Sequence, residues 1–168
     1  GFVNYRWIAA LSLGKIGGAW FDHGDCDAHD FLDQAYQTVL AGAPEIILFN
    51  YADLAAGHGG HDLLRANFPR LADLAAAVRE HPVVGVSAYK PPNSDAGGDL
   101  YIMDFLGMLG VPLVPAAEFD ADAKAIFLPT QAAADREILA KVRRAVENGE
   151  TMRELTEQTD PAAAVRAA

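Results

Sequence analysis

Residues 17–54 read GGAWFDHGDCDAHDFLDQAYQTVLAGAPEIILFNYADL, and this stretch decides the fold. It holds two short apolar runs, Gly17 to Phe21 and Ile46 to Phe49, on either side of a longer segment with helical periodicity. The order strand, helix, strand predicts one βαβ unit whose strands run parallel. In the helical segment the apolar side chains fall on one side: Phe31, Leu32, Ala35, Tyr36, Val39 and Leu40.

The ends of this helix are marked in the sequence. Asp27 is a candidate N-cap residue, and Asp30 three positions later gives a pattern similar to a capping box. Gly42 marks the C-terminal end. The run from Ile46 to Phe49 is apolar without interruption, which predicts a parallel strand that is covered on both faces.

The rest of the chain continues the same alternation. Apolar runs at residues 83–89, 113–118 and 125–129 predict three more strands, with helices between most of them. Pro115 has no backbone N–H to donate, which predicts that its strand lies at the edge of a sheet. After Gly149 the residues become polar or alanine-rich, and no further buried strand is predicted.

The fold class is therefore α/β, with mainly parallel strands. A further helix is expected from near Asp62, and Pro69 either kinks or restarts it. Two arrangements fit this pattern: two partial domains with a break at residues 80–83, or a single five-stranded doubly wound sheet. Ile47 and Val84 on hydrogen-bonded neighbouring strands would favour the single sheet.

Composition and charge limit the classes of partner. The chain has 168 residues, of which 51% are hydrophobic and 21% charged, a balance typical of a globular protein. Its net charge of -10 repels phosphate backbones and anionic membrane surfaces, so we expect no nucleic-acid and no membrane partner. No apolar run approaches the ~18 residues of a membrane helix. The single cysteine, Cys26, excludes an internal disulfide and indicates no particular compartment.

The loop after the first predicted strand is rich in metal-ligand types of side chain. Asp22, His23 and Cys26 lie there, and His58 and His61 follow later, but their spacing matches neither a zinc finger nor a zincin. Flexible acidic loops and helix caps account for the carboxylates, so no metal site is predicted. The glycine-rich turn around His58 lacks the spacing of a phosphate-binding fingerprint, and no cofactor is predicted.

Five segments together resemble a known arrangement. In order, they resemble the junction region of multidomain glycoside-hydrolase-like proteins, where the last strands of a (β/α)8 barrel run into an amidotransferase-like, flavodoxin-like domain. β-Galactosidases with a trimerisation domain are such proteins. The resemblance spans about residues 10–149, and implies barrel βα units at residues 1–81 and a partial amidotransferase-like domain at 82–168. The segments are GGAWFD (17–22), QTVLAGAPEIILFNY (37–51), VVGVSAYKPPNS (83–94), DFLGMLGVPLVPAAEF (104–119) and AIFLPT (125–130).

For the first part, the resemblance implies a carbohydrate-active protein that uses two carboxylates around the glycosidic bond. A glutamate commonly ends the seventh strand of this barrel, and here Asp22 holds the matching place as the predicted catalytic residue. Asn50 and Tyr51 end the next strand, and Trp20 shares a strand face with Asp22, so these three are the predicted sugar-binding residues. The alternatives are core packing for Trp20 and a hydrogen bond to the next loop for Asp22. The partner carboxylate would lie upstream of Gly1, so we expect this chain alone to be catalytically incomplete.

For the second part, the resemblance implies a domain without catalysis. A working class I amidotransferase needs a cysteine nucleophile at a strand-to-helix turn, and no cysteine follows Cys26. The second domain therefore resembles the versions used for subunit contacts or for lectin-like and regulatory roles. The alternative function for the chain is a non-catalytic amidotransferase-like binding or oligomerisation module, with a homo-oligomer formed through this domain.

Overall fold

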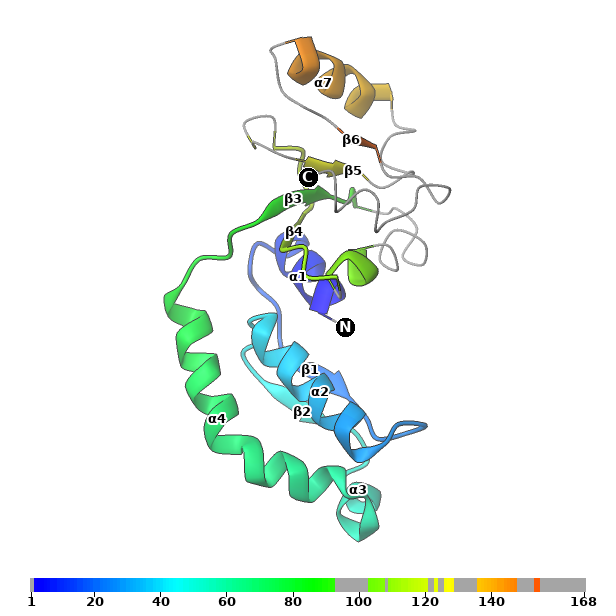
Figure 1. Ribbon diagram of the computed structural model, residues 1–168, viewed down its shortest axis with the longest axis vertical. Coiled ribbons are helices and arrows are strands. Elements are labelled where there is room, and N and C mark those ends of the chain that lie inside the picture. Colours follow the sequence, from blue (N-terminus) through cyan, green and yellow to red (C-terminus); the bar gives the residue numbers. More distant parts are fainter. Residues whose placement is uncertain are drawn as a thin grey trace. The chain divides into compact units, whose positions relative to one another are not determined.

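The computed structural model describes residues 2–92, 103–107, 109–120, 123, 126–128, 136–147 and 153–154. The chain divides into two compact units, Gly1–Pro82 and Val83–Ala168 (Figure 1). All strand pairs among the described residues are parallel, and helices alternate with strands. The predicted α/β class is therefore confirmed.

In the first unit two strands form a small parallel sheet. β1 (Ala19–Phe21) pairs with β2 (Ile46–Leu48), and α2 (Ala28–Leu40) connects them, so the predicted βαβ unit is confirmed. The other elements of the unit are three helices: α1 (Phe2–Leu11), α3 (Tyr51–Gly57) and α4 (Gly60–Glu80).

Helix α2 begins and ends where the sequence predicts. The Oδ1 atom of Asp27 accepts hydrogen bonds from the backbone N–H groups of His29 at 2.8 Å and Asp30 at 2.9 Å. The Asp30 carboxylate in turn accepts from the backbone N–H of Asp27 at 3.5 Å, which completes the capping box. At the other end Gly42 has φ +80°, a left-handed conformation that terminates the helix. Local sequence thus determines both ends.

The α3–α4 region contains one helix that was not predicted. Seven residues are too few to show a helical period in α3, and the fully buried Leu54 anchors it. Helix α4 begins at Gly60, two residues before the predicted start near Asp62, and it continues through Pro69 as one element, so Pro69 does not restart it. Figure 1 shows that α4 bends along its length, the usual effect of a proline that leaves one helical hydrogen bond unmade.

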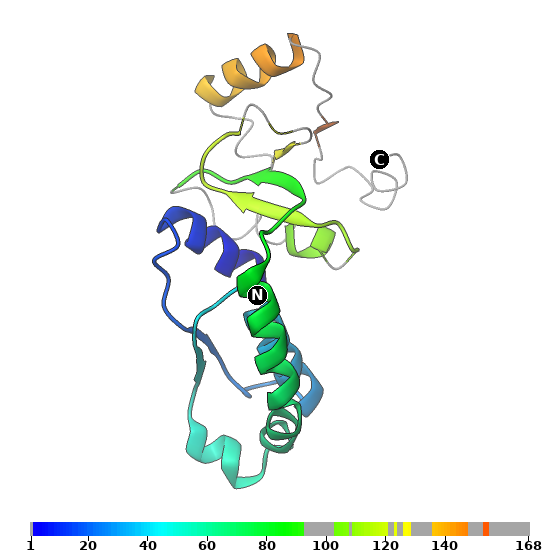
Figure 2. The same cartoon turned by 90° about the vertical axis from the view of Figure 1, so that its left-hand side faces the viewer.

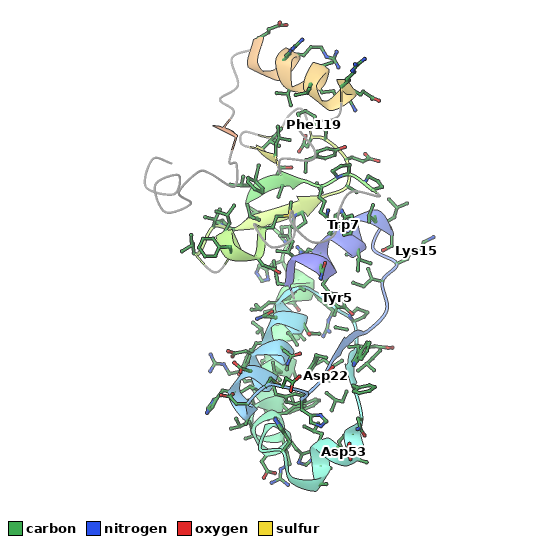
Figure 3. The ribbon with its side chains drawn as sticks, turned by 90° about the vertical axis from the view of Figure 1, so that its right-hand side faces the viewer. Tyr5, Trp7, Lys15, Asp22, Asp53 and Phe119 are labelled. Atoms are coloured by element: carbon green, nitrogen blue, oxygen red, sulfur yellow. The ribbon has the colours of Figure 1, made fainter. Side chains whose placement is uncertain are left out.

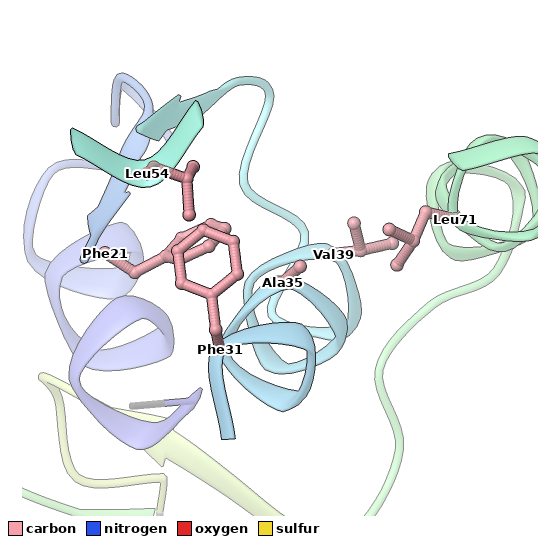
Figure 4. Packing of buried hydrophobic residues seen from close by; sticks show 6 residues of the cluster. All are labelled: Phe21, Phe31, Ala35, Val39, Leu54 and Leu71. Atoms are coloured by element: carbon pink, nitrogen blue, oxygen red, sulfur yellow. The ribbon is translucent and has the colours of Figure 1, made fainter. Parts of the chain in front are cut away.

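The core of the first unit lies between the sheet and its helices. α4 packs along α2 (Figure 1 and Figure 2). At the centre, the ring of Phe31 is fully buried, with its centroid 5.1 Å from that of Phe21 on β1 (Figure 4). Leu54 from α3 and Leu71 from α4 belong to the same cluster. Burial of apolar surface from four elements therefore holds the carboxyl end of β1 in place.

The second unit is a four-stranded parallel sheet with the strand order β4-β3-β5-β6. β4 carries Pro115 and lies at the edge, as predicted. A Cβ atom on Gly85, just before β3, would lie 1.9 Å from the carbonyl oxygen of Pro112, so the approach of β3 to β4 requires glycine there. Residues 103–107 are helical. The elements with printed bounds are β3 (Val86–Tyr89), β4 (Leu113–Ala116), β5 (Ile126–Leu128), α7 (Arg136–Glu147) and β6 (Arg153–Glu154).

One alternative for the sheets does not hold. The described strands form two sheets and not a single five-stranded one, because Ile47 pairs with Trp20 and Val84 precedes β3. A short strand that was not predicted, β6, pairs with β5 after Gly149, which itself lies outside the described residues. Its two residues are polar and show no apolar run.

None of the helices among the described residues combines the length and apolar character that a membrane crossing requires.

Candidate functional site

The sugar-binding candidates lie at the carboxyl ends of β1 and β2. The two strands stay paired to their ends, where the backbone N–H of Phe49 donates to the carbonyl oxygen of Phe21 at 3.2 Å. Asp22 follows β1 directly, while Asn50 and Tyr51 follow β2 after one intervening residue. The structure thus brings these three predicted residues to one edge of the small sheet, where parallel sheets usually bind ligands.

Asp22 is held by its own loop and by α2 (Figure 3). Its Oδ1 atom accepts the backbone N–H of Gly24 at 2.8 Å. Its carbonyl oxygen accepts from Nε2 of Gln34 at 3.0 Å and from Sγ of Cys26 at 3.6 Å. The alternative role for Asp22, a hydrogen bond to the next loop, is therefore present. It uses one carboxylate oxygen, and among the described residues none donates a hydrogen bond to the other.

Asn50 has a conformation that few residue types adopt. Its φ is +46°, in the left-handed region that asparagine tolerates better than most residues. Its side-chain amide donates to the carboxylate of Asp53, and its carbonyl oxygen accepts from the backbone N–H of Leu54 at 3.2 Å. Asn50 therefore precedes the first residue of α3, and its amide also occupies one acceptor position of the Asp53 carboxylate. This second role was not predicted.

Tyr51 is exposed and has a histidine partner. Its side chain is 55% exposed, and its hydroxyl oxygen lies 3.2 Å from Nε2 of His61. The Nδ1 atom of His61 is 3.5 Å from Oδ1 of Asp62. His61 was not predicted as a partner of Tyr51, because the two residues lie on different helices and no sequence spacing links them.

Trp20 belongs to an apolar sheet face that is open to solvent. Trp20 is 62% exposed, Ile47 47% and Phe49 52%, and the ring centroids of Trp20 and Phe49 are 5.3 Å apart. Neighbouring Phe21 is buried, since the helices cover only its side of the sheet. Among the described residues Trp20 is therefore not part of the core, and helices cover only one face of β2. We call Trp20, Ile47 and Phe49 the open face.

The acids at the strand ends differ in their surroundings. Asp22 lies on the loop after β1 and Asp53 lies in α3 (Figure 3), where Asn50 engages its carboxylate. In the part of the chain that the structure describes, no three His, Cys, Asp or Glu side chains are grouped to hold a metal ion.

Cys26 is not an activated nucleophile. Burial raises the pKa of its thiol, and the negative charges of Asp30, Asp22 and Asp27 raise it further. A protonated thiol reacts slowly. Its contacts with Asp22 and Gln34 make it a structural residue of the loop.

Two family models match this chain in different parts. Residues 1–64 match one described as a probable glycosyl hydrolase, catalytic domain, and residues 78–151 match one described as the second domain of the uncharacterized protein SSO3021. Neither description mentions an amidotransferase. No curated protein and no solved structure matches the chain. Residues 1–64, which carry the strand-end residues described above, are therefore similar to a glycosyl hydrolase catalytic domain.

Proposed function

We propose that the first unit is part of a carbohydrate-active, glycoside-hydrolase-like domain and supplies the last two βα units of a (β/α)8 barrel. In this proposal Asp22 is the catalytic carboxylate that the unit contributes. Asn50, Tyr51 and Trp20 line the sugar side of the same site.

The observation that carries this proposal is the open face of the β1–β2 sheet. Parallel sheets are normally covered on both faces, and here helices cover one face while Trp20, Ile47 and Phe49 stay exposed on the other. In a (β/α)8 barrel the helices form the outer ring, and the inner strand face is packed against the other strands. The open face has the apolar character of such an inner face, and the match to a glycosyl hydrolase catalytic domain supports the same assignment.

The chemistry that this chain offers is incomplete. Hydrolysis of a glycosidic bond needs two carboxyl groups, about 5 Å apart for retention or about 6.5–9.5 Å apart for inversion. Asp22 is one candidate and ends β1 directly, whereas Asp53 lies within α3. In our proposal a second carboxylate comes from another strand of the barrel, and the 168-residue chain alone has no turnover.

The test uses the native reading frame extended upstream of Gly1. We expect it to encode about six further βα units, the number that completes an eight-fold barrel. The extended protein is then assayed on a panel of aryl glycosides, together with Asp22→Asn and, as a matched control on the same loop, the exposed Asp25→Asn. Turnover lost only in Asp22→Asn supports the proposal. Absence of the upstream units, or full turnover in Asp22→Asn, would overturn it.

For the second unit we propose a non-catalytic amidotransferase-like module for binding or oligomerisation. The supporting observation is the strand order of its sheet, β4-β3-β5-β6. The first strand, β3, lies between β4 and β5, so the chain adds strands first on one side of β3 and then on the other, as in doubly wound folds. Light scattering of the full chain during size exclusion tests the oligomeric role. A mass of at least twice the 17.9 kDa of one chain is expected, and a monomer at all concentrations would contradict it.

A further inference from the structure

The turn between α3 and α4 contains a histidine whose two ring nitrogens both have partners. Nε2 of His58 lies 3.1 Å from the carbonyl oxygen of Cys26, and the backbone N–H of Gly60 donates to Nδ1 at 3.1 Å. A backbone N–H can only donate, so Nδ1 must be unprotonated. The ring proton therefore sits on Nε2 and is donated to Cys26. These two hydrogen bonds define one neutral tautomer of His58.

Two glycines allow this turn to approach α2 closely. A Cβ atom on Gly60 would lie 2.6 Å from the ring of Phe31 and 2.7 Å from Nδ1 of His58, and one on Gly59 would lie 3.3 Å from Cβ of Ala28. The ring of Phe31 is itself fully buried and meets the His58 ring edge-on at 5.8 Å. The position of the imidazole is thus fixed by packing as well as by hydrogen bonds.

The residue that His58 holds belongs to the loop that carries Asp22. We call residues 22–27 the strand-end loop. Gln34 of α2 binds this loop at the carbonyl oxygen of Asp22, and His58 binds it at that of Cys26. We infer that His58 is a positioning residue, which fixes the strand-end loop to the α3–α4 turn through its neutral Nε2–H tautomer. We call the two hydrogen bonds of His58, to Cys26 and to Gly60, the His58 bridge. That the bridge positions Asp22 for catalysis rests on the proposed function, but the bridge itself does not.

Two substitutions separate the two hydrogen bonds. In His58→Asn the side-chain oxygen can still accept a hydrogen bond from the N–H of Gly60, as in an Asx turn. The asparagine side chain is too short to reach the carbonyl oxygen of Cys26. In His58→Gln the side-chain amide matches Nε2 and can donate to Cys26, while the acceptor for Gly60 is lost. The exposed His29→Gln on α2 serves as the matched control.

The measurement is amide hydrogen exchange by NMR on the full chain. In His58→Asn we expect exchange at Gly24, in the strand-end loop, to become about fivefold faster while Gly60 is unchanged, the factor for one hydrogen bond. In His58→Gln we expect the opposite, and in His29→Gln no change. Equal effects at both amides, or none, would show that His58 only packs and would overturn the inference.

A measurement on the unmodified protein keeps the inference testable if a variant does not fold. The ring nitrogen signals of His58 should show a proton on Nε2 and none on Nδ1. A proton on Nδ1 would overturn the bridge. Glycosidase activity is a separate readout, because its absence in the extended protein would refute the proposed function and leave these signals unaffected.

Discussion

At the scale of single residues, hydrogen bonds to the backbone determine the chemistry near the strand ends. The Asp27 carboxylate accepts hydrogen bonds from two backbone N–H groups at the start of α2, while the Cys26 thiol is partly buried near carboxylates. The first arrangement stabilises the charged form of its side chain and the second destabilises it. Two predictions follow from these opposite effects.

Replacing Asp27 tests its contribution to acid stability. The N–H groups of Asp30 and His29 lower the pKa of Asp27, so its stabilising effect is present above the ordinary value of about 3.9 and is lost as the pH falls through the lower folded value. Asparagine also caps helices but does not titrate. Thermal unfolding of Asp27→Asn should therefore depend less on pH below about 4 than that of the unmodified protein. The exposed Asp33→Asn on α2 is the control, and an equal pH dependence in Asp27→Asn would contradict the prediction.

The raised pKa of Cys26 predicts low thiol reactivity. At neutral pH the folded chain should react with iodoacetamide more slowly than the same chain unfolded in denaturant, because less thiolate is present and the sulfur is shielded. Mass spectrometry of the alkylated chain measures both rates. Equal rates in the folded and unfolded states would show that the fold neither shields the thiol nor raises its pKa, and would contradict the prediction.

At the scale of the elements, one ring joins four of them. Phe31 on α2 contacts β1 through Phe21, and Gly60 at the start of α4 approaches it closely. Leu54 brings α3 into the same cluster. The strand-end loop therefore depends on α2 packing, and not only on its own hydrogen bonds.

Truncation of Phe31 tests this packing. Phe31→Ala should lower the free energy of unfolding of the first unit by about 3–5 kcal/mol, because it removes a fully buried ring. Both tryptophans, Trp7 and Trp20, lie in this unit, so their fluorescence during denaturant unfolding reports on it. Leu40→Ala on the exposed side of the same helix is the control, with a change of about 1 kcal/mol or less. A loss below about 1 kcal/mol for Phe31→Ala would contradict the packing argument.

At the scale of the whole molecule, the two units differ in how much of their sheets is covered. The first unit keeps one sheet face open, and the second has apolar residues of β3, β5 and α7 packed together around Tyr89, Ile126 and Val142. In our proposal the other strands of the barrel cover this open apolar face. The effect of a charged substitution on the open face depends on what covers that face.

A lysine on the open face distinguishes a free surface from a barrel interior. Ile47→Lys should leave the stability of the 168-residue chain nearly unchanged, since Ile47 is 47% exposed, and should reduce binding of a hydrophobic dye. In the extended protein the same change should prevent stable folding, because an unpaired charge would be buried. Leu40→Lys, on the outer helix α2, should be tolerated in both proteins. A stable extended protein with Ile47→Lys would contradict a barrel.

Several features of the fold and of the site were predictable because they depend on local chemistry. Asp22 ends a strand, Asp27 caps a helix and Pro115 marks a sheet edge, and each of these follows from backbone requirements of neighbouring residues. The partners of Asn50 and Tyr51 were not predictable in the same way. Asp53 and His61 reach them through the short helix α3 and the turn after it, whose geometry leaves no periodic pattern.

The sequence by itself determined the α/β class, the βαβ unit and both ends of α2, because apolar periodicity and capping are properties of short segments. Only the tertiary structure decided that the strands divide into two sheets, that the face of Trp20 is open, and that His58 binds the loop of Asp22. The bridge joins residues 32 positions apart, and strand pairing and burial likewise depend on distant segments. No local pattern encodes which of those distant segments meet, since the free energy of each contact is set by the whole packed core.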